Sequence, residues 1–567
     1  MNLTRRAFHA HLLAAALMPA LPSLARSATN PPEQLLNRLT FGANPASRAA
    51  LASLGPAAWL DQQLAMPASD PGLQDRLASA RLRIAYAADD DGEGHAWPAR
   101  DDLAALDWLH RDSADAVPLL DFADGMDYSE RVRPAAEVIA ASLIRAVHAP
   151  AQLREVMTQF WHDHFNVNAM KFEATAAFFP AHDAMLRENA LGNFRTLLGG
   201  VARSPAMLYY LNNEDSRASP ANENFARELL ELHTLGAENY QNDTAPDWHN
   251  VPGAADGLAL AYIDQDVYEV ARAFTGWTVG DGRYLAEGSD APKTGTFLYV
   301  EAWHDPYQKR ILAVEFAPNA APMADGDRVM DILATHPGTA RHLSRKLIRR
   351  LLTDDPDPAM VERVARVFLA HSASPDQIAR TLRAIVAEPA FAATPPEKLR
   401  RPFEFLAAIY RATGAEISAP EASFDWQLSG AGWFQHQYGP PTGHPDRAER
   451  WSSASTLNRM VDLALYAHDD WFACTKTKIT DLLPAGPISF DILRQTYVPL
   501  LQGDPANPLE ADPPQADPPQ ADPLDAMAAQ LDIADPAELF ELNEEELHGF
   551  ATAVIAFAAL SPRFMLR

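Results

Sequence analysis

The sequence has almost no cysteine, and this excludes two ways of stabilising a fold. Cys474 is the only cysteine among 567 residues, so no disulfide forms within the chain and no cluster of thiolates can hold a metal. Stability therefore has to come from packing. A hydrophobic content of 47% and this chain length are sufficient for several cores.

Long apolar runs and basic residues are also scarce. Beyond the first thirty residues, no run reaches the roughly 18 apolar residues that a membrane-spanning helix needs, so we expect no membrane span in the mature chain. Lys and Arg number 47 against 75 Asp and Glu, which gives a net charge of −28. A field of that sign repels nucleic acid and anionic lipid, so we expect no nucleic-acid partner.

The sequence also lacks the common catalytic signatures. It contains no H-E-x-x-H and no G-x-S-x-G, and Cys474 has no histidine pattern near it beyond His468. Nucleophilic catalysis therefore has little support, and other residue patterns have to be considered.

Residues 1–28 have the layout of a signal peptide. Arg5 and Arg6 form a twin-arginine pair, and an apolar stretch over 12–24 leads into small residues. The pattern predicts export by the Tat route, with the Tat translocase as a partner during export and the periplasm as the destination. Loss of residues 1–27 removes three arginines and no acid, which moves the net charge from −28 to −31.

Helical periodicity dominates residues 29–567, and we predict a mainly α protein: a large multi-helical domain with a small β-hairpin near 296–316. The hairpin is expected from β-branched and aromatic runs at 296–300 and 310–316, with little other β-structure.

Two further features concern the organisation of the chain. It divides into possible lobes, 29–325 and 326–567, near the predicted hairpin. Residues 503–524 repeat A-D-P-P-Q, and so acidic and proline-dense a segment cannot bury a core. We expect a disordered insert there.

The stretch 219–236 has the start and stop signals of a complete helix. Ser219 fits the N-cap, Pro220 the first helical position, and Gly236 the left-handed residue after the last turn. Most of its circumference is apolar. A polar stripe crosses it at Asn224, Arg227, Glu228 and Glu231.

The polar stripe allows two interpretations. Glu228 and Glu231 share a face, and two carboxylates held close together have split pKa values, as acid and base catalysis requires; His233 would join them. Alternatively, Arg227 and Glu231 have the i,i+4 spacing of an ion pair, and Arg272 from the next predicted helix reaches the same stripe. The sequence does not decide between a site and a structural network.

A metal site is a second hypothesis. His162, His164 and His304 are suitable ligands for zinc, iron or manganese, but their spacing matches no established signature. In a helix, His162 and His164 point about 200° apart. The alternative is that these histidines lie at aromatic edges and make buried hydrogen bonds.

A basic stretch at 341–350 (R-H-L-S-R-K-L-I-R-R) is a third candidate, for a phosphate, sulfate or uronate group. The alternative is pairing with the acids at 354–357. A Pro/Gly loop follows at 439–446.

Asp266 and Glu269 have the spacing of a capping box, which predicts a structural role for both.

Several segments together resemble a known family. They are F-W-H-D-H-F-N-V at 160–167, N-E-N-F-A-R-E-L-L-E-L-H-T-L-G at 222–236, D-V-Y-E-V-A-R-A-F-T-G-W at 266–277 and H-D-P-Y-Q-K at 304–309. In this order they resemble the bacterial family called domain of unknown function 1800. The chain departs from the family in the 503–524 insert and in a long segment at 241–263.

The resemblance implies an exported, mainly helical protein without an assigned reaction. Members are often encoded beside a sulfatase-like exported family, domain of unknown function 1501, which suggests such a protein as a partner. The motif residues proposed for ligand binding are Asn224, Arg227, Arg272, Trp277, Asp305 and Lys309.

We therefore expect a periplasmic binding or accessory protein that works with another exported protein. The alternative is a metal- or carboxylate-dependent hydrolase acting on a cell-envelope or imported polymer. Whether a divalent metal is bound stays open.

Overall fold

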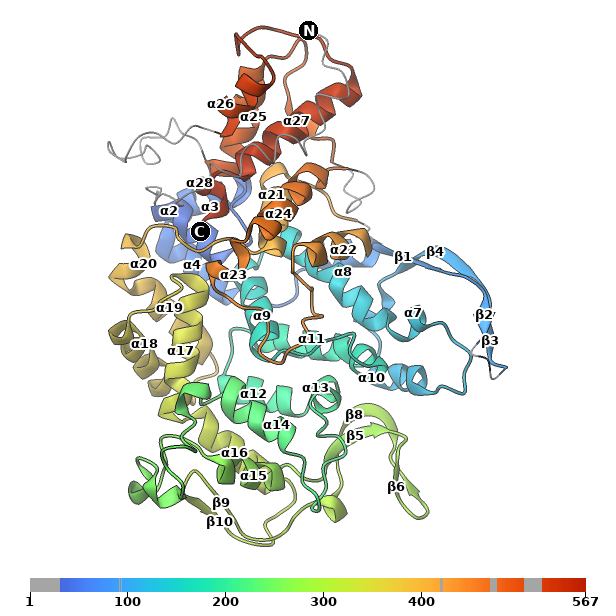
Figure 1. Cartoon of the computed structure of the whole chain (residues 1–567), viewed down its shortest axis with the longest axis vertical. Coiled ribbons are helices and arrows are strands. Elements are labelled where there is room, and N and C mark those ends of the chain that lie inside the picture. Colours follow the sequence, from blue (N-terminus) through green and yellow to red (C-terminus); the bar gives the residue numbers. More distant parts are fainter. Residues whose placement is uncertain (1–30, 91, 93, 419–421, 470–476, 504–522) are drawn as a thin grey trace.

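The computed structural model describes residues 31–90, 92, 94–418, 422–469, 477–503 and 523–567 (Figure 1). The expected signal peptide and nearly all of the expected 503–524 insert lie outside these residues. Within them, helices form most of the structure and the strands are short and paired two by two. The predicted mainly α class is confirmed.

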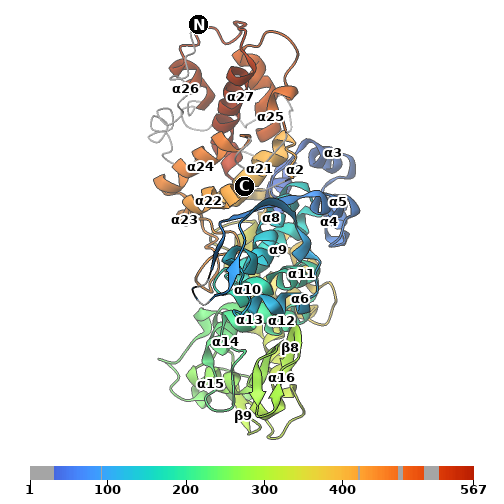
Figure 2. The same ribbon diagram turned by 90° about the vertical axis from the view of Figure 1, so that its right-hand side faces the viewer.

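Three helices form the centre: α8 (Arg133–His148), α9 (Gln152–His164) and α21 (Pro402–Thr413). Almost every side chain on them is buried, polar ones included, because other helices cover them on all sides. Helix α8 packs against α21 and α11, and α9 packs against α11 and α4. Figures 1 and 2 show α8 and α9 near the middle of an elongated molecule.

Other helices surround this centre, and many of them begin with proline, whose missing N–H costs nothing at the first helical position. Those of the first half are α2 (Pro31–Leu39), α3 (Pro45–Leu54), α4 (Pro56–Ala65), α5 (Pro71–Ser79), α6 (Ser113–Ala116), α7 (Tyr128–Arg131), α10 (Glu173–Ala177), α11 (Phe179–Asn189), α12 (Phe194–Ala202), α13 (Pro205–Tyr210), α14 (Glu223–Glu228) and α15 (Asp264–Ala273). Those of the second half are α16 (Ala324–Ala334), α17 (Pro337–Leu351), α18 (Pro358–Ala370), α19 (Gln377–Ala387), α20 (Pro389–Ala393), α22 (Ala422–Gly430), α23 (Ala448–Trp451), α24 (Ala454–Tyr466), α25 (Phe490–Gln502), α26 (Pro523–Gln530), α27 (Glu544–Ala559) and α28 (Pro562–Met565).

The two ends of the molecule are built from different parts of the chain. Helices α25, α26 and α27 form the upper end. Helices α14, α15 and α16 and the strands between residues 277 and 316 form the lower end (Figures 1 and 2). Among the described residues, none of the helices has the length and apolar character that crossing a membrane demands.

The strands differ from the predicted single hairpin. β8 (Lys293–Tyr299) pairs with β5 (Trp277–Asp281), and β9 (Lys309–Ile311) pairs with β10 (Val314–Phe316). The predicted pairing of 296–300 with 310–316 is therefore wrong. The second run folds back on itself because Leu312 and its neighbour take positive φ values of 50° and 65°, as a tight two-residue hairpin turn requires.

The other β-structure of the described residues consists only of small two-stranded antiparallel pairs, as the expectation of little other β-structure requires. The largest of these pairs is a ribbon between residues 81 and 105, in which antiparallel strands pair residue by residue. Its strands are β1 (Arg81–Tyr86), β2 (Asp89–Asp90), β3 (Ala96–Trp97) and β4 (Arg100–Ala105), and a further short pair is β6 (Tyr284–Ala286) with β7 (Ser289–Asp290).

Candidate functional site

The stretch 219–236 forms a shorter α-helix than the sequence predicts. Helix α14 covers Glu223–Glu228, and the Asn222 side chain caps it by accepting a backbone hydrogen bond at 2.9 Å. The predicted start at Ser219 and Pro220 is wrong, because asparagine caps as well as serine and lies closer to the apolar run.

A π-helical turn, Leu229–His233, continues the motif. The Gly236 N–H donates to the Leu230 carbonyl at 3.1 Å, and its φ of +92° is the value that favours glycine at a helix end. Single π turns occur often at functional sites. Here the turn buries His233, which is 1% exposed.

The predicted ion pair between Arg227 and Glu231 does not form. Arg227 instead lies 3.3 Å from Asp264 and 3.6 Å from Glu223. Among the described residues, neither Glu228 nor Glu231 has a hydrogen-bond or ion-pair partner. Burial and the neighbouring charge of Glu231 raise the pKa of the Glu228 carboxyl.

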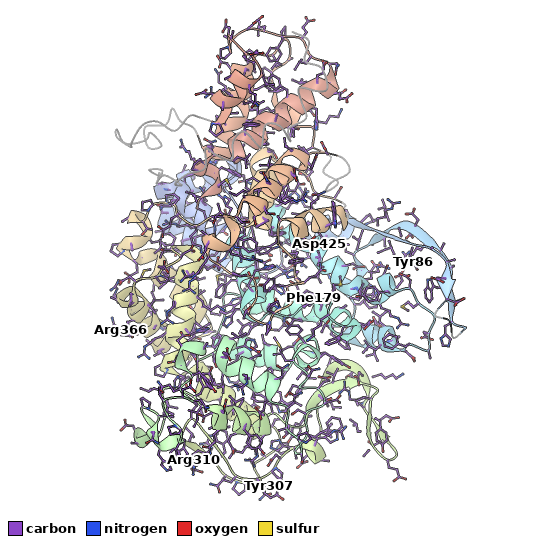
Figure 3. The ribbon with its side chains drawn as sticks, in the orientation of Figure 1. Tyr86, Phe179, Tyr307, Arg310, Arg366 and Asp425 are labelled. Carbon is purple, nitrogen blue, oxygen red and sulfur yellow. The ribbon has the colours of Figure 1, made fainter. Side chains whose placement is uncertain are left out.

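The predicted contact between Arg272 and this polar stripe is also wrong. Arg272 holds Asp305 through two hydrogen bonds of 2.7 and 3.0 Å, and Lys309 donates to Asp325 at 2.7 Å. His304 donates from Nδ1 to a backbone carbonyl at 3.0 Å. These pairs fasten the segment 304–309 to α15 and α16, at the lower end where Figure 3 labels Tyr307.

Three other motif residues have structural contacts. The Asn224 side chain donates to the Leu211 carbonyl at 3.1 Å. Trp277 is fully buried, with the Arg203 guanidinium 4.9 Å above its ring. Asp266 accepts from the backbone of Ile263 at 3.0 Å. The predicted structural role of Asp266 is confirmed, although it is the third residue of α15 rather than its N-cap.

His162 belongs to a buried network of charges between α8, α9 and α11. Its Nε2 lies 3.0 Å from Asp183, which also accepts hydrogen bonds from Arg145 at 2.9 Å and Arg187 at 2.7 Å. These partners hold the pKa of Asp183 well below its usual value against the effect of burial. Phe179, near the centre in Figure 3, packs against the His162 ring.

His164 points to the opposite side of α9, as the helical spacing predicted. Its Nε2 donates to the His233 carbonyl at 3.1 Å. Neither ring nitrogen of His233 has a hydrogen-bond partner among the described residues, and burial lowers its pKa to about 3. His162, His164 and His304 thus lie in three different environments. No three metal-ligating side chains come together in the described part of the chain.

A cavity of about 240 Å³ opens on the His164 side of α9. Helix α9, helix α17, the start of α21 and the loop 439–447 form its walls. The residues that line it are Phe160, Asp163, His164, Lys346, Arg349, Arg350, Arg401, Thr442, His444, Pro445, Asp446 and Arg447. We call it the basic pocket.

Positive charge exceeds negative charge in the basic pocket. Asp163 accepts a hydrogen bond from Arg401 at 2.8 Å, and Asp446 lies 3.4 Å from Lys398, so both carboxylates already have cations. Lys346 is half-buried and has no hydrogen-bond or ion-pair partner among the described residues. Burial lowers the pKa of its ammonium group to about 8, so it is charged at pH 7.

A buried cluster beneath the pocket fixes two of its arginines. Glu404 lies 3.0 Å from Arg401 and 3.4 Å from Arg567, and it also contacts Arg350. The three guanidinium groups hold the pKa of Glu404 well below its usual value. Glu404 therefore fixes one end of the Arg350 guanidinium group, and the Nη1 atom of that group lies 3.7 Å from the Asp446 carboxylate.

Sequence reasoning found one wall of this pocket and missed the others. The basic stretch 341–350 contributes Lys346 and Arg350. Arg349 donates to the Asp354 backbone carbonyl at 3.1 Å, and neither Arg349 nor Lys346 forms the expected ion pair with the acids at 354–357. Nothing in the sequence linked this helix to the loop 439–447.

Gly443 fits the loop tightly against α9, and this gives a testable prediction. Its φ is +68°, and a Cβ there would lie 1.8 Å from the Asp163 carbonyl oxygen. We expect Gly443→Ala to displace the loop and to lower the free energy of unfolding by about 1–3 kcal/mol. Gly439→Ala, where a Cβ meets nothing within 4 Å, is the matched control. Equal thermal unfolding of both variants would contradict this placement of the loop.

Together, these features define a mainly helical protein with a basic pocket between its central helices. The chain matches the family model described as protein of unknown function (DUF1800) over residues 34–566, and it belongs to that family. No curated protein and no solved structure matches it.

Proposed function

We propose that the protein is an exported binding protein that holds an anionic group of its ligand in the basic pocket. Lys346 carries this proposal. It is a half-buried ammonium group that lines the cavity without a protein partner, in a chain whose net charge is −28. A buried cation is costly unless it is paired, and an anionic ligand supplies the missing charge.

The pocket chemistry supports binding rather than hydrolysis. Its two carboxylates, Asp163 and Asp446, serve as counter-ions to Arg401 and Lys398, which leaves neither free as a general acid or base. The two carboxylates proposed for the hydrolase alternative, Glu228 and Glu231, do not line this cavity.

The sequence supports a proposed place of action and a proposed partner. The twin-arginine segment supports work in the periplasm after Tat export. The family resemblance supports an exported, sulfatase-like protein of the domain of unknown function 1501 family as the partner, and the anion-binding protein would hold a ligand for it.

Removing the Lys346 charge tests the proposal. Because a hydrogen bond to a charged group contributes about 1.5–3 kcal/mol, we expect Lys346→Met to weaken binding of phosphate or D-glucuronate at least about tenfold. Isothermal titration calorimetry at pH 7 measures this. Lys293→Met, at an exposed position on β8, is the control and should bind like the wild type. Equal affinity of both variants would refute the proposal.

The same lysine sets a pH dependence. A pKa of about 8 means that Lys346 loses its charge as the pH rises through that value. If only the ammonium form binds, affinity falls about tenfold between pH 7 and pH 9. The Lys346→Met variant should lack this dependence, and a wild-type affinity that is constant from pH 7 to pH 9 would contradict the role of Lys346.

A further inference from the structure

The basic pocket offers hydrogen-bond acceptors as well as cations, and this narrows the chemistry of its ligand. His164 and His444 both line the cavity, and both are more than nine-tenths buried. The Nδ1 atom of each has no hydrogen-bond partner among the described residues. A buried polar atom without a partner is costly, so the ligand should satisfy both.

The backbone contacts of His164 assign its proton. Its Nε2 lies 3.1 Å from the His233 carbonyl oxygen, which only accepts hydrogen bonds, so Nε2 carries the hydrogen. Burial and the nearby charge of Lys346 push the pKa of His164 well below its usual value, which keeps the ring neutral. Its Nδ1 is therefore a lone pair that needs a donor.

His444 has the same arrangement on the facing wall. Its Nε2 lies 3.0 Å from the Phe434 carbonyl oxygen and 3.3 Å from the Phe434 N–H. The shorter contact makes Nε2 the donor to the carbonyl. Burial lowers the pKa of His444 to about 4, so at neutral pH its Nδ1 is also an acceptor.

A simple anion cannot satisfy this set of groups. A fully ionised sulfate or a plain carboxylate offers only acceptors, which suits Lys346 but leaves both histidine lone pairs unpaired. A neutral sugar offers hydroxyl donors and leaves Lys346 without a counter-charge. A hydroxylated anion supplies both kinds of group.

We propose that the ligand of the basic pocket is a hydroxylated anion of monosaccharide size, with its acidic group at Lys346 and hydroxyl groups donating to His164 and His444. This inference rests on the proposed function. The cavity of about 240 Å³ suits one small molecule or the terminal unit of a chain. Phe160 and Pro445 give it apolar surface against which the carbon face of a sugar ring can pack.

A panel of ligands that separates charge from hydroxyl groups tests the inference on the unmodified protein. Calorimetric titration at pH 7 would compare D-glucuronate, which has both features, with cyclohexanecarboxylate, which has the charge alone, and D-glucose, which has the hydroxyl groups alone. We expect D-glucuronate to bind at least about tenfold more tightly than either, since two hydrogen bonds or one charge contact are lost in each comparison. D-Glucose 6-phosphate, titrated in parallel, distinguishes a sugar phosphate from a sugar acid as the preferred source of the anion.

The outcomes separate this inference from the proposed function. If cyclohexanecarboxylate binds as tightly as D-glucuronate, the histidine lone pairs play no part, and the inference is overturned while anion binding stands. If D-glucose binds as tightly as D-glucuronate, the charge plays no part and both proposals fail. If none of the four compounds binds, the proposed function itself fails.

Discussion

Asp183→Asn is expected to lower the free energy of unfolding by about 3–5 kcal/mol, the usual cost of breaking a buried ion pair by removing one partner. Asp183 is 2% exposed and holds Arg145, Arg187 and His162 between helices α8, α9 and α11. Asparagine has nearly the same shape but no charge. Two buried guanidinium groups would then share only the remaining carboxylate, Glu155, which contacts Arg187.

Chemical denaturation, followed by tryptophan fluorescence, measures this loss. The control is Asp61→Asn, which breaks an exposed pair with Arg383 whose side chains are 58% and 53% exposed. Such surface pairs contribute about 0–1 kcal/mol. A loss below about 1 kcal/mol in Asp183→Asn as well would mean that the network does not stabilise the fold.

The same carboxylate gives a pH dependence with a definite sign. Its folded pKa lies well below the unfolded value of about 3.9. The stabilisation by Asp183 is therefore fully present above the unfolded pKa and is lost as the pH falls through the folded pKa. Between pH 6 and pH 3 the wild type should lose more stability than the Asp183→Asn variant, which lacks the titrating group.

Replacing both Arg5 and Arg6 with lysine should abolish export almost completely. The charge of the segment stays the same, so only the twin-arginine pattern is removed, and that pattern is what the Tat receptor recognises. Fractionation of cells followed by immunoblotting should find full-length precursor in the cytoplasm. The matched control, Arg26→Lys, changes an arginine of the same leader outside the pair and should leave export unchanged. Mature protein in the periplasm of the double variant would contradict Tat export.

The local features of the structure followed from the sequence to a large extent. Helical periodicity gave the mainly α class, and the 100° step per residue correctly placed His162 and His164 on opposite sides of one helix. The structural role of Asp266 was visible for the same reason, although the pattern paired it with Glu269 and the structure pairs it with the backbone of Ile263, three residues before it. Such features depend on neighbours in the chain.

The basic pocket could not be predicted in the same way. Its walls come from segments around residues 160, 346, 401 and 442–447, and only the fold brings them together. The basic stretch 341–350 was visible, but the choice of Lys346 over its neighbours was not, since Arg341 and Arg345 find acids on other elements. The prediction of strand pairing failed for a related reason. The connection between β5 and β8 includes a second short strand pair, and sequence spacing does not specify which strands pair.

The central claim is that Lys346 holds the acidic group of a ligand in the basic pocket, and a crystal structure of the protein grown with D-glucuronate tests it most directly. The account predicts density for the sugar acid in the cavity, with its carboxylate within hydrogen-bond distance of the Lys346 Nζ. A sugar acid bound only elsewhere, or bound here with its carboxylate directed away from Lys346, would contradict it.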